Sequence, residues 1–354
     1  MAVQRPSLIK DQVETLQELY ALELPQIISS SEDRPFPENI KRVYAIGNGD
    51  SYHAALSATQ SFAAWANVEY IPMPAYTFLK TEMNRIKKGQ SEETLVVCIS
   101  ASGSSALCLG IMEKLKSSGL AQTLALTGKV ENAMDRAADW ILPTVISEKG
   151  RSPGIRTFAA SFTGLVALAL RFNTDPKLGG RLAKAIASSG DHMLRIIAES
   201  EKSATEAEKW DWPNTMVLGL DGLLGCASFV AAKFVEGSGI LASSHELEEW
   251  CHVESMAYPL NSPVIILHGN DCTTKQVEKV SSVARKAGRP VLIVSSLAPE
   301  HFRDVADCVV SLHGVECEEL LPIYHYIPCV VLVHTLAEKY GRAMFLSDLP
   351  FSLF

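Results

Sequence analysis

Short apolar runs alternate with helical stretches along the first half of the chain. The runs are rich in β-branched residues and lie at residues 43–46, 94–99, 123–127 and 140–143. Their length and composition are typical of buried strands. Residues 8–28 carry apolar side chains at helical spacing and predict a lead-in helix, and residues 132–138 predict another helix. Strands that alternate with helices indicate βαβ units, and therefore a parallel sheet covered by helices on both faces.

The second half of the chain repeats this pattern at a nearly constant distance along the sequence. Four apolar runs, at residues 216–219, 264–268, 290–294 and 305–310, correspond in order to the four runs of the first half. The offset is 172 residues for the first pair of runs and 168 for the second and fourth pairs. We therefore predict an α/β protein made by tandem duplication, each copy a parallel-sheet three-layer α/β/α sandwich. The expected parts are a lead-in helix at 1–35, a first domain at 36–198 and a second domain at 199–354.

Composition and charge narrow the class of protein. Of the 354 residues, 47% are hydrophobic and 20% are charged, which allows two domains with sizeable cores. The formal net charge of −8 argues against non-specific binding to nucleic acid, which needs basic patches. No apolar run reaches the roughly 18 residues of a transmembrane helix, and the charged, helical N-terminus does not resemble a signal peptide. We expect a cytoplasmic protein that binds neither nucleic acid nor a membrane.

The sequence contains no recognisable motif for binding a metal or a nucleotide cofactor. The eight cysteines form no C-x-x-C motif and no zinc-like pairing with histidine, and most lie in apolar runs. We expect buried free thiols, no disulfide and no metal. The turn at 47–51 (GNGDS) lacks the full G-x-G-x-x-G spacing of a dinucleotide site, and no P-loop occurs. We therefore expect no cofactor.

The turn after the second predicted strand is the first candidate for a binding site. Ligands of such folds bind at the carboxyl ends of the parallel strands. Here that edge carries Ser100, Ser102, Ser104 and Ser105, with Gly103 among them, directly before a predicted helix. Small hydroxyl side chains and free N–H groups at the N-terminus of a helix suit a phosphate group. The alternative is a serine-rich turn that only caps the helix, and the residues alone leave both interpretations open.

A second candidate begins with Lys233 and Glu236, which are three residues apart and share one face of a predicted helix. His252 follows sixteen residues after Glu236, beyond a break at 237–239. A carboxylate base and an imidazole acid are the minimum for moving a proton at the carbon beside a carbonyl. The alternative for Lys233 and Glu236 is a solvated ion pair, which their spacing alone favours. The alternative for His252 is a polar cap of a helix that starts at Ser244.

These segments together resemble the sugar isomerase (SIS) family. The arrangement is similar to the tandem SIS domains of the isomerase half of glucosamine-6-phosphate synthase and of the fructosamine-6-phosphate deglycases. Residues 49–54 (GDSYHA) look like that family's GTSYHA turn, residues 100–105 (SASGSS) like its SQSGET phosphate loop, and residues 233–236 (KFVE) like its KLKE segment. The resemblance covers about residues 43–350 and implies two tandem SIS domains of flavodoxin-like fold.

The resemblance also implies roles for single residues. Glu236 falls on the enolising base and His252 on the histidine that opens the sugar ring, with Lys233 as a third catalytic residue. The implied substrate-binding residues are Gly49, Asp50, Ser51, Ser100, Ala101, Ser102, Gly103, Ser105, Arg156 and Glu249. A homodimer is implied as well, in which His252 reaches into the neighbouring subunit.

The chain departs from the family pattern at several positions. Asp50 replaces a Thr and Ala101 a Gln, and an acid close to a phosphate dianion repels it unless the acid faces sugar hydroxyls or a cation. Arg156 replaces the Lys of the family's VASTK segment. No amidotransferase domain precedes the first SIS domain, and residues 348–354 lack the lysine with which the tail of the synthase binds the keto sugar. We therefore expect no glutamine-dependent synthesis.

The implied function is an enzyme of the sugar-phosphate isomerase or deglycase type. The leading hypothesis is a deglycase that cleaves a fructosamine (Amadori) 6-phosphate into an aldose 6-phosphate and a free amine by proton transfer between C1 and C2. An aldose–ketose phosphosugar isomerase, or an amino-sugar deaminating isomerase, is the alternative within the same chemistry. A non-catalytic sensor of sugar phosphates is the alternative of another class. The expected small-molecule partner is a sugar phosphate or a fructosyl amine.

Overall fold

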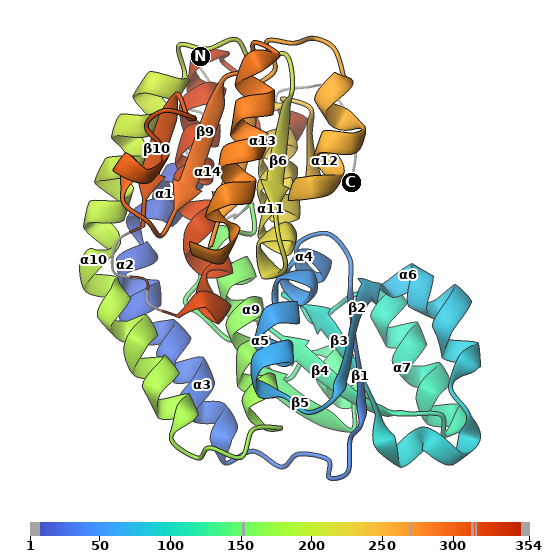
Figure 1. Cartoon of the computed structure of the whole chain (residues 1–354). Coiled ribbons are helices and arrows are strands. Elements are labelled where there is room, and N and C mark those ends of the chain that lie inside the picture. The colour runs from blue at the N-terminus through green and yellow to red at the C-terminus, as the bar shows by residue number, and fades with distance from the viewer. Residues whose placement is uncertain (1–7, 151–152, 270, 313–314, 316, 348–354) are drawn as a thin grey trace. The chain divides into compact units, whose positions relative to one another are not determined.

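The computed structural model describes residues 8–150, 153–269, 271–312, 315 and 317–347 (Figure 1). The chain divides into two compact units, each with one five-stranded sheet. As far as they are described, unit 1 comprises Met1–Gln17, Lys149–Ile155 and Asp191–Phe354, and unit 2 comprises Glu18–Glu148 and Arg156–Gly190. The domain limits expected at 36–198 and 199–354 stay predictions.

Unit 2 contains the parallel sheet expected from the first half of the sequence. Its strands are β1 (Arg42–Gly47), β2 (Glu69–Pro74), β3 (Thr94–Ser100), β4 (Gln122–Thr127) and β5 (Trp140–Pro143). They pair in the order β2-β1-β3-β4-β5, and every pair is parallel. The four predicted strands are confirmed, and β2 is additional. Strand β2 carries Pro72 and Pro74, which weaken a strand pattern but are tolerated at the edge of a sheet, where β2 lies.

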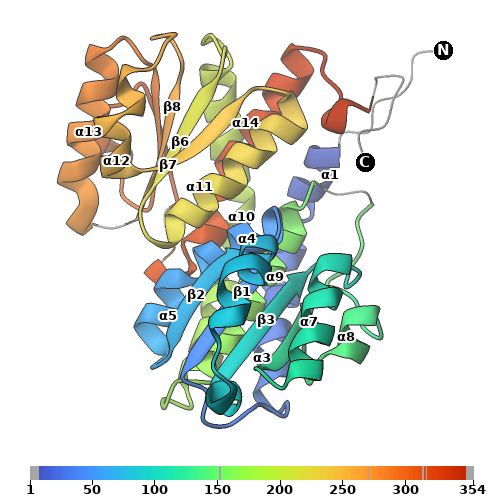
Figure 2. The ribbon, with the colours of Figure 1, turned by 90° about the vertical axis from the view of Figure 1, so that its right-hand side faces the viewer.

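Helices cover both faces of the sheet in unit 2. On one face Tyr44, Val96 and Cys98 pack with buried side chains of α7 (Ala106–Ser118) and α8 (Ala133–Ala137); Figure 2 shows these two helices together beside β3. On the other face α4 (Asp50–Ser57) lies against β1, and α9 (Ile155–Leu170) passes so close to β4 that a Cβ at Gly164 would lie 3.2 Å from the Leu126 side chain. Strand β3 is therefore buried along its whole length.

Unit 1 repeats the same strand order. Its strands are β6 (Thr215–Gly219), β7 (Ala242–Glu246), β8 (Val264–His268), β9 (Val291–Ser295) and β10 (Cys308–Ser311). They pair as β10-β9-β8-β6-β7, again all parallel. Counted along the chain, both sheets have the order 2-1-3-4-5, which is that of flavodoxin-like doubly wound folds. The four strands predicted here are confirmed, but the last begins at Cys308 and not at residue 305.

The prediction that a helix starts at Ser244 is wrong. Residues 242–246 form the edge strand β7, and the helix α12 begins only at Leu247 and ends at His252. The segment ASSHE has a single apolar residue, because an edge strand with half-exposed side chains needs no apolar alternation. This strand was hidden from sequence analysis for that reason.

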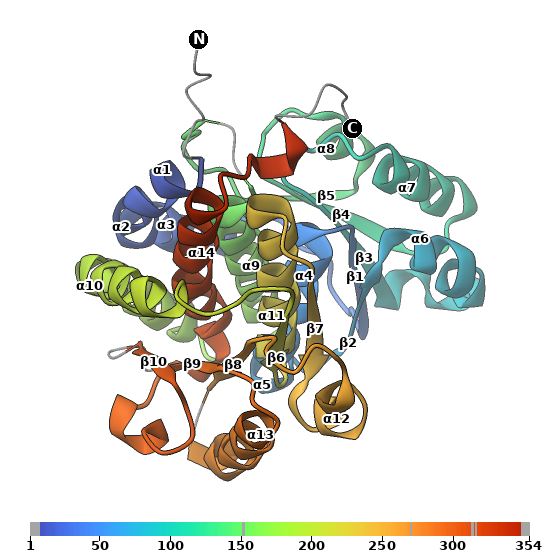
Figure 3. The ribbon, with the colours of Figure 1, turned by 90° about the horizontal axis from the view of Figure 1, so that it is seen from above.

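The helices of unit 1 also lie on two faces. Leu247 and Trp250 of α12 pack with Met216, Leu218 and side chains of α13 (Thr274–Lys286) on one face. Helix α11 (Gly222–Lys233) contacts β6, β7 and α14 (Pro322–Lys339) on the other face. Figure 3 shows α11 and α14 on one side of this sheet and α12 and α13 on the other.

The lead-in segment is helical, as predicted, but in several pieces. They are α1 (Leu8–Glu14), α2 (Leu16–Glu18), a π-helical turn η1 (Leu19–Glu23) and α3 (Leu24–Glu32). A long helix, α10 (Leu178–Ala207), runs from unit 2 into unit 1. Within the described ranges, none of the helices combines the length and the apolar composition needed to cross a bilayer. Four cysteines are buried as expected, whereas Cys251, Cys308 and Cys317 are partly exposed and Cys272 is exposed.

Candidate functional site

The serine loop, residues 100–105, joins β3 to α7 in unit 2. Ser105 is the N-cap of α7, and its Oγ accepts a hydrogen bond from the N–H of Cys108 at 3.3 Å. The Oγ of Ser102 lies 2.8 Å from the Oγ of Ser104 and 3.4 Å from that of Ser100. Ser102 and Ser104 are exposed. One serine therefore caps the helix while the hydroxyls before it gather at the N-terminus of a 13-residue helix, where an anion is stabilised.

Gly103 fixes the shape of the serine loop. Its φ is 65°, and its N–H donates a hydrogen bond to the carbonyl of Ser100 at 3.1 Å. A Cβ at this position would lie 2.2 Å from Cγ of Asn132, the N-cap of α8. The N–H of Met134 in turn donates to the carbonyl of Gly103 at 3.3 Å. The loop is thus seated on the start of the next helix, and only glycine fits at its centre.

The turn at Gly49, Asp50 and Ser51 leaves the sheet beside the serine loop, because β1 and β3 are neighbouring parallel strands. Gly49 has a φ of 53° and precedes α4, whose first residue is Asp50. Oδ1 of Asp50 lies 3.8 Å from Nδ1 of His53, and 28% and 17% of the two side chains are exposed. Sequence analysis included this histidine in the turn at residues 49–54 but gave it no role.

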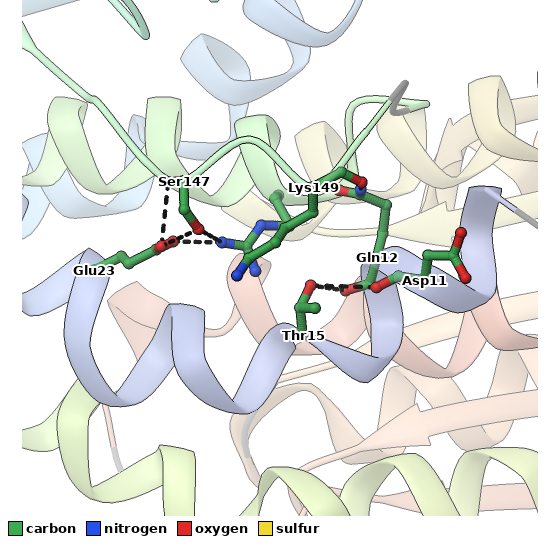
Figure 4. Close-up of polar contacts among 7 residues, drawn as sticks. Asp11, Gln12, Thr15, Glu23, Ser147 and Lys149 are labelled. Atoms are coloured by element: carbon green, nitrogen blue, oxygen red, sulfur yellow. Dashed lines mark hydrogen bonds and ion pairs between the residues drawn. The ribbon is translucent and has the colours of Figure 1, made fainter.

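Arg156 is buried in an ion pair. Its Nη2 donates to Oε2 of Glu23 at 2.5 Å and to Oγ of Ser147 at 3.0 Å, and only 2% of the side chain is exposed. The N–H of Ser147 donates to Oε1 of Glu23 at 3.1 Å (Figure 4). A substrate group that reached Arg156 would compete with Glu23, so its assignment to the substrate stays a prediction. Glu23, on the π-helical turn η1, was not singled out in the sequence.

The pKa values of two cysteine thiols next to the serine loop, those of Cys98 and Cys108, differ from the usual value. The Cys98 thiol, hydrogen-bonded to Cys108, and the Ser105 hydroxyl lower the pKa of the Cys108 thiol to about 7, although burial opposes this. The same hydrogen bond and burial raise the pKa of Cys98 well above its usual value. The two thiols therefore share polar contacts at the start of α7.

Lys233 and Glu236 are in direct contact in unit 1. Nζ of Lys233 donates to Oε2 of Glu236 and to the carbonyl of Pro153, both at 2.5 Å, and it lies 4.8 Å from the centre of the Phe229 ring. Lys233 is 1% exposed, whereas a third of the Glu236 side chain is exposed. The solvated ion pair favoured by spacing is therefore wrong for Lys233. Its burial depends on Pro153, 80 residues away in the sequence.

The backbone of this pair is unusual. Helix α11 ends at Lys233 and continues as the π-helical turn η5 (Phe234–Ser238), which carries Glu236. Single π-helical turns are frequent at functional sites. A Cβ at Gly237 would lie 2.5 Å from Val333 of α14, so η5 is packed tightly against that helix. The carboxylate of Glu236 is thus held on a rigid support with one oxygen bound to an ammonium group.

His252 ends α12. Its side chain is 66% exposed, and Nε2 lies 3.6 Å from Oε1 of Glu248. The N–H of Glu249 donates to Oε2 of Glu246, which caps α12, at 2.7 Å, and the side chain of Glu249 is exposed. The helices that carry Glu236 and His252 cover opposite faces of one sheet. The structure therefore brings Lys233 to Glu236, but it puts His252 beside Glu248.

The described parts of the chain contain no cluster of three or more His, Cys, Asp or Glu side chains placed to hold a metal ion. The terminal residues 348–354, on which the expected loss of the sugar-binding lysine rests, lie outside the described residues.

Comparison with known proteins agrees with the motifs. Residues 38–171 match the SIS domain. Glutamine–fructose-6-phosphate aminotransferase (isomerizing) of Aquifex aeolicus is 27% identical over 320 residues, which are 90% of this chain and 52% of that protein. The protein of the same name from Thermococcus kodakarensis is 26% identical over 318 residues, covering 86% and 50%. The chain thus spans about half the length of the curated relatives it matches.

Solved structures share the fold. The C-terminal domain of glucosamine-fructose-6-phosphate aminotransferase from Francisella tularensis has a TM-score of 0.79 at 16% identity, covering 97% of this chain and 99% of that chain. Glucosamine-6-phosphate deaminase from Thermotoga maritima has a TM-score of 0.71 at 16% identity, covering 96% and 98%. Together with the sequence matches, these likenesses confirm the resemblance inferred from the motifs.

Proposed function

We propose, since residues 38–171 of this chain are a SIS domain, that the protein is a phosphosugar enzyme of the isomerase type and, more closely, a deglycase for fructosamine 6-phosphates. The observation that carries the proposal is the contact between the buried ammonium of Lys233 and the carboxylate of Glu236, whose side chain is one third exposed. Unit 1 repeats the strand order of unit 2, which supports a second SIS domain and a tandem arrangement of two sandwiches.

The anionic end of the substrate binds at the serine loop in this proposal. The hydroxyls of Ser100 and Ser102 and the N-terminus of α7, capped by Ser105, supply neutral donors and a favourable dipole. Ser51 contributes a further hydroxyl at the adjacent turn. Asp50 is oriented towards His53, at 3.8 Å, and in that position its charge bears less on a phosphate dianion.

Glu236 transfers the proton. In a fructosamine the amine is on C1 and the carbonyl on C2, so a carboxylate can take a proton from C1 to give an enaminol and return it to C2. The result is an imine at C1, to which water adds, and the amine leaves with formation of the aldose phosphate. An ammonium group 2.5 Å from the carboxylate holds it in place for both steps. His252 assists the opening of the sugar ring.

Two copies of the chain complete the site in this proposal. The sheet of unit 1 stands between the helices that carry Glu236 and His252. Directly after His252, a run of apolar side chains is exposed, with 56% of Val253, 68% of Met256 and 84% of Tyr258 accessible. Contiguous exposed apolar side chains are typical of an interface. A homodimer in which His252 enters the partner's site accounts for both observations.

The test compares the wild type with Glu236→Gln on a panel of sugar phosphates and fructosyl amines. The panel contains glucose 6-phosphate, fructose 6-phosphate, and fructosyl amino acids with and without the 6-phosphate. We expect turnover of a phosphorylated fructosyl amine by the wild type, and loss of turnover with retained binding in Glu236→Gln. The matched control is Glu206→Gln, because Glu206 forms an ion pair of the same spacing with Lys209 but both side chains are 62% exposed. This control is expected to keep full activity.

Other outcomes decide among the alternatives. Interconversion of glucose 6-phosphate and fructose 6-phosphate, lost in Glu236→Gln, would replace the deglycase by an aldose–ketose isomerase. Release of ammonia from glucosamine 6-phosphate would indicate a deaminating isomerase. Binding of a sugar phosphate without turnover of any compound would make the protein a sensor.

A further inference from the structure

A buried arginine lies beneath the segment that follows His252. Arg289 is located between α13 and β9, flanked by Gly288 with a φ of 84° and by Pro290. It is 1% exposed and is among the largest fully buried side chains of the protein. Neither the sequence motifs nor the proposed chemistry uses this residue.

In the part of the chain that the structure describes, the hydrogen bonds of the Arg289 side chain all go to one short stretch of backbone. Nη1 donates to the carbonyl of Pro259 at 3.2 Å, and Nη2 donates to the carbonyls of Ser255, at 3.4 Å, and of Ala257. Three alternate carbonyls of residues 255–259 thus converge on one guanidinium group. The planar fork of arginine can bind several acceptors at once, which the point charge of lysine cannot do.

The burial of this cation is costly. Desolvation lowers the pKa of Arg289 from its usual value, and no neighbouring carboxylate enters as a cause that opposes it. Its Nε is buried and has no hydrogen-bond partner among the described residues. A buried charge that binds only carbonyl dipoles is not a cheap source of stability. Such a residue is better explained by the geometry that it imposes on the carbonyls.

Besides Arg289, the segment is held by the N–H and Oγ of Ser262, which donate to the carbonyl of Pro259 at 3.3 and 2.8 Å, and by Nδ2 of Asn261, which donates to Oδ2 of Asp211 at 3.3 Å. Residues 252–261 are mostly exposed, and no more than a third of the surface of Met256 or Tyr258 is buried. On its other side the segment is joined to β7 by the contact of Glu254 Oε1 with His245 Nδ1, at 3.4 Å. Its short 3₁₀ turn, Glu254–Met256, follows directly after α12. Carbonyls at the end of a helical turn lack a partner within it, and Arg289 binds two of them, those of Ser255 and Ala257; at Pro259 it adds to the bonds from Ser262.

We propose that Arg289 is a positioning residue that fixes the segment 253–260 and, through it, the end of α12 where His252 stands. This inference rests on the role of His252 in the proposed function. Arg289 itself does not touch the substrate. It orders the backbone from which His252 and the exposed apolar side chains project.

The experiment is hydrogen exchange on the full-length protein with the variant Arg289→Ala. We expect the amides of Met256 and Ala257, which donate to the carbonyls of Val253 and Glu254, to exchange about tenfold faster or more, which is the factor that corresponds to losing a charge-assisted hydrogen bond. Added guanidinium chloride, at concentrations below those that unfold the protein, is expected to restore slow exchange by filling the vacated space. The matched control is Arg285→Ala, because Arg285 also donates to a backbone carbonyl, that of Asp304 at 2.8 Å, but contacts a different segment.

Unchanged exchange at Met256 and Ala257 in Arg289→Ala would overturn the proposal. Faster exchange spread evenly over unit 1 would overturn it too, because that would indicate general destabilisation. If Arg289→Ala does not fold, Arg289→Lys takes its place in the same comparison, with a smaller expected increase. In the activity assay, Arg289→Ala is expected to lower kcat while the Kd for glucose 6-phosphate stays unchanged. Absence of turnover in the wild type would refute the proposed function but would leave the exchange result to decide on Arg289.

Discussion

The substitution Gly103→Ala is expected to destabilise unit 2 by about 3 kcal/mol, and this figure follows from three separate effects. A φ of 65° costs an alanine about 1 kcal/mol relative to glycine. The new Cβ would lie 2.2 Å from Cγ of Asn132, so that this side chain has to move. Its movement removes the N-cap of α8, in which Oδ1 accepts the N–H of Asp135 at 3.0 Å, at a cost of about 1 kcal/mol.

The third effect is a further hydrogen bond of Asn132. Its Nδ2 donates to Oγ1 of Thr127 at 3.0 Å, and the loss of this bond adds about 1 kcal/mol. The control is Gly119→Ala at the C-cap of α7. Gly119 has nearly the same φ, 61°, but a Cβ there would meet nothing within 4 Å. We expect this control to cost only the conformational part, about 1 kcal/mol.

Urea-induced unfolding of the two single variants measures the difference between them. The variant Asn132→Ala, alone and combined with Gly103→Ala, closes a double-mutant cycle. In the Asn132→Ala background, Gly103→Ala should cost about as much as Gly119→Ala, because the side chain that it displaces is gone. Binding of glucose 6-phosphate should be weakened in Gly103→Ala and unchanged in Gly119→Ala. Equal stability of Gly103→Ala and Gly119→Ala would refute the account of the serine loop given above.

Three further predictions concern buried or charged groups. Burial lowers the pKa of His325 from 6.5 to about 4, so the unfolded chain binds the proton more tightly; stability is then fully present above pH 6.5 and falls by about 3 kcal/mol as the pH drops towards 4. In His325→Gln, urea unfolding at pH 7 and pH 4.5 should show a smaller loss. Glu23→Gln leaves the buried charge of Arg156 without its carboxylate and should cost about 3 kcal/mol in the same assay. Because Asp50 is directed towards His53, Asp50→Thr should change the affinity for glucose 6-phosphate by no more than about threefold in a titration; a tenfold gain would mean that the charge of Asp50 faces the phosphate.

Six of the strands that sequence analysis predicted, β1, β3, β4, β6, β8 and β9, lie inside the sheets and are almost wholly buried. The edge strands β5 and β10 are partly exposed and were predicted because each still carries a short apolar run. Strands β3 and β8 are apolar throughout because helices cover both of their sides, so they are recognisable without knowledge of their neighbours. The edge strands β2 and β7 were missed because they need no such pattern: β2 carries two prolines, and β7 is mostly serine and polar residues. Their existence is decided by pairing with β1 and β6, which are distant in the sequence.

The candidate site shows the same division between local and distant information. The cap at Ser105 and the glycine at the centre of the serine loop follow from local backbone geometry, and the sequence indicates both. The burial of Lys233 depends on the carbonyl of Pro153, and the position of Arg156 depends on Glu23. Neither Pro153 nor Glu23 belongs to a recognisable motif, and a contact made by a backbone carbonyl cannot be predicted from the pattern of side chains. Residue types near a site are thus predictable, whereas their partners require the fold.

The placement of Glu236 and His252 on opposite faces of one sheet leads to a quantitative expectation for a shared site. In a two-fold symmetric dimer each His252 serves the partner's Glu236, so a dimer of one Glu236→Gln chain and one His252→Ala chain has one intact site and one site with both changes. Random exchange of equal amounts makes half of the dimers mixed, and the mixture should regain about one quarter of the wild-type turnover. If each site used residues of a single chain, no mixed dimer would hold an intact site, and the turnover would stay at the level of the two inactive variants. Verified mixed dimers without recovery would therefore refute the shared site and return His252 to its contact with Glu248, at 3.6 Å on the same helix.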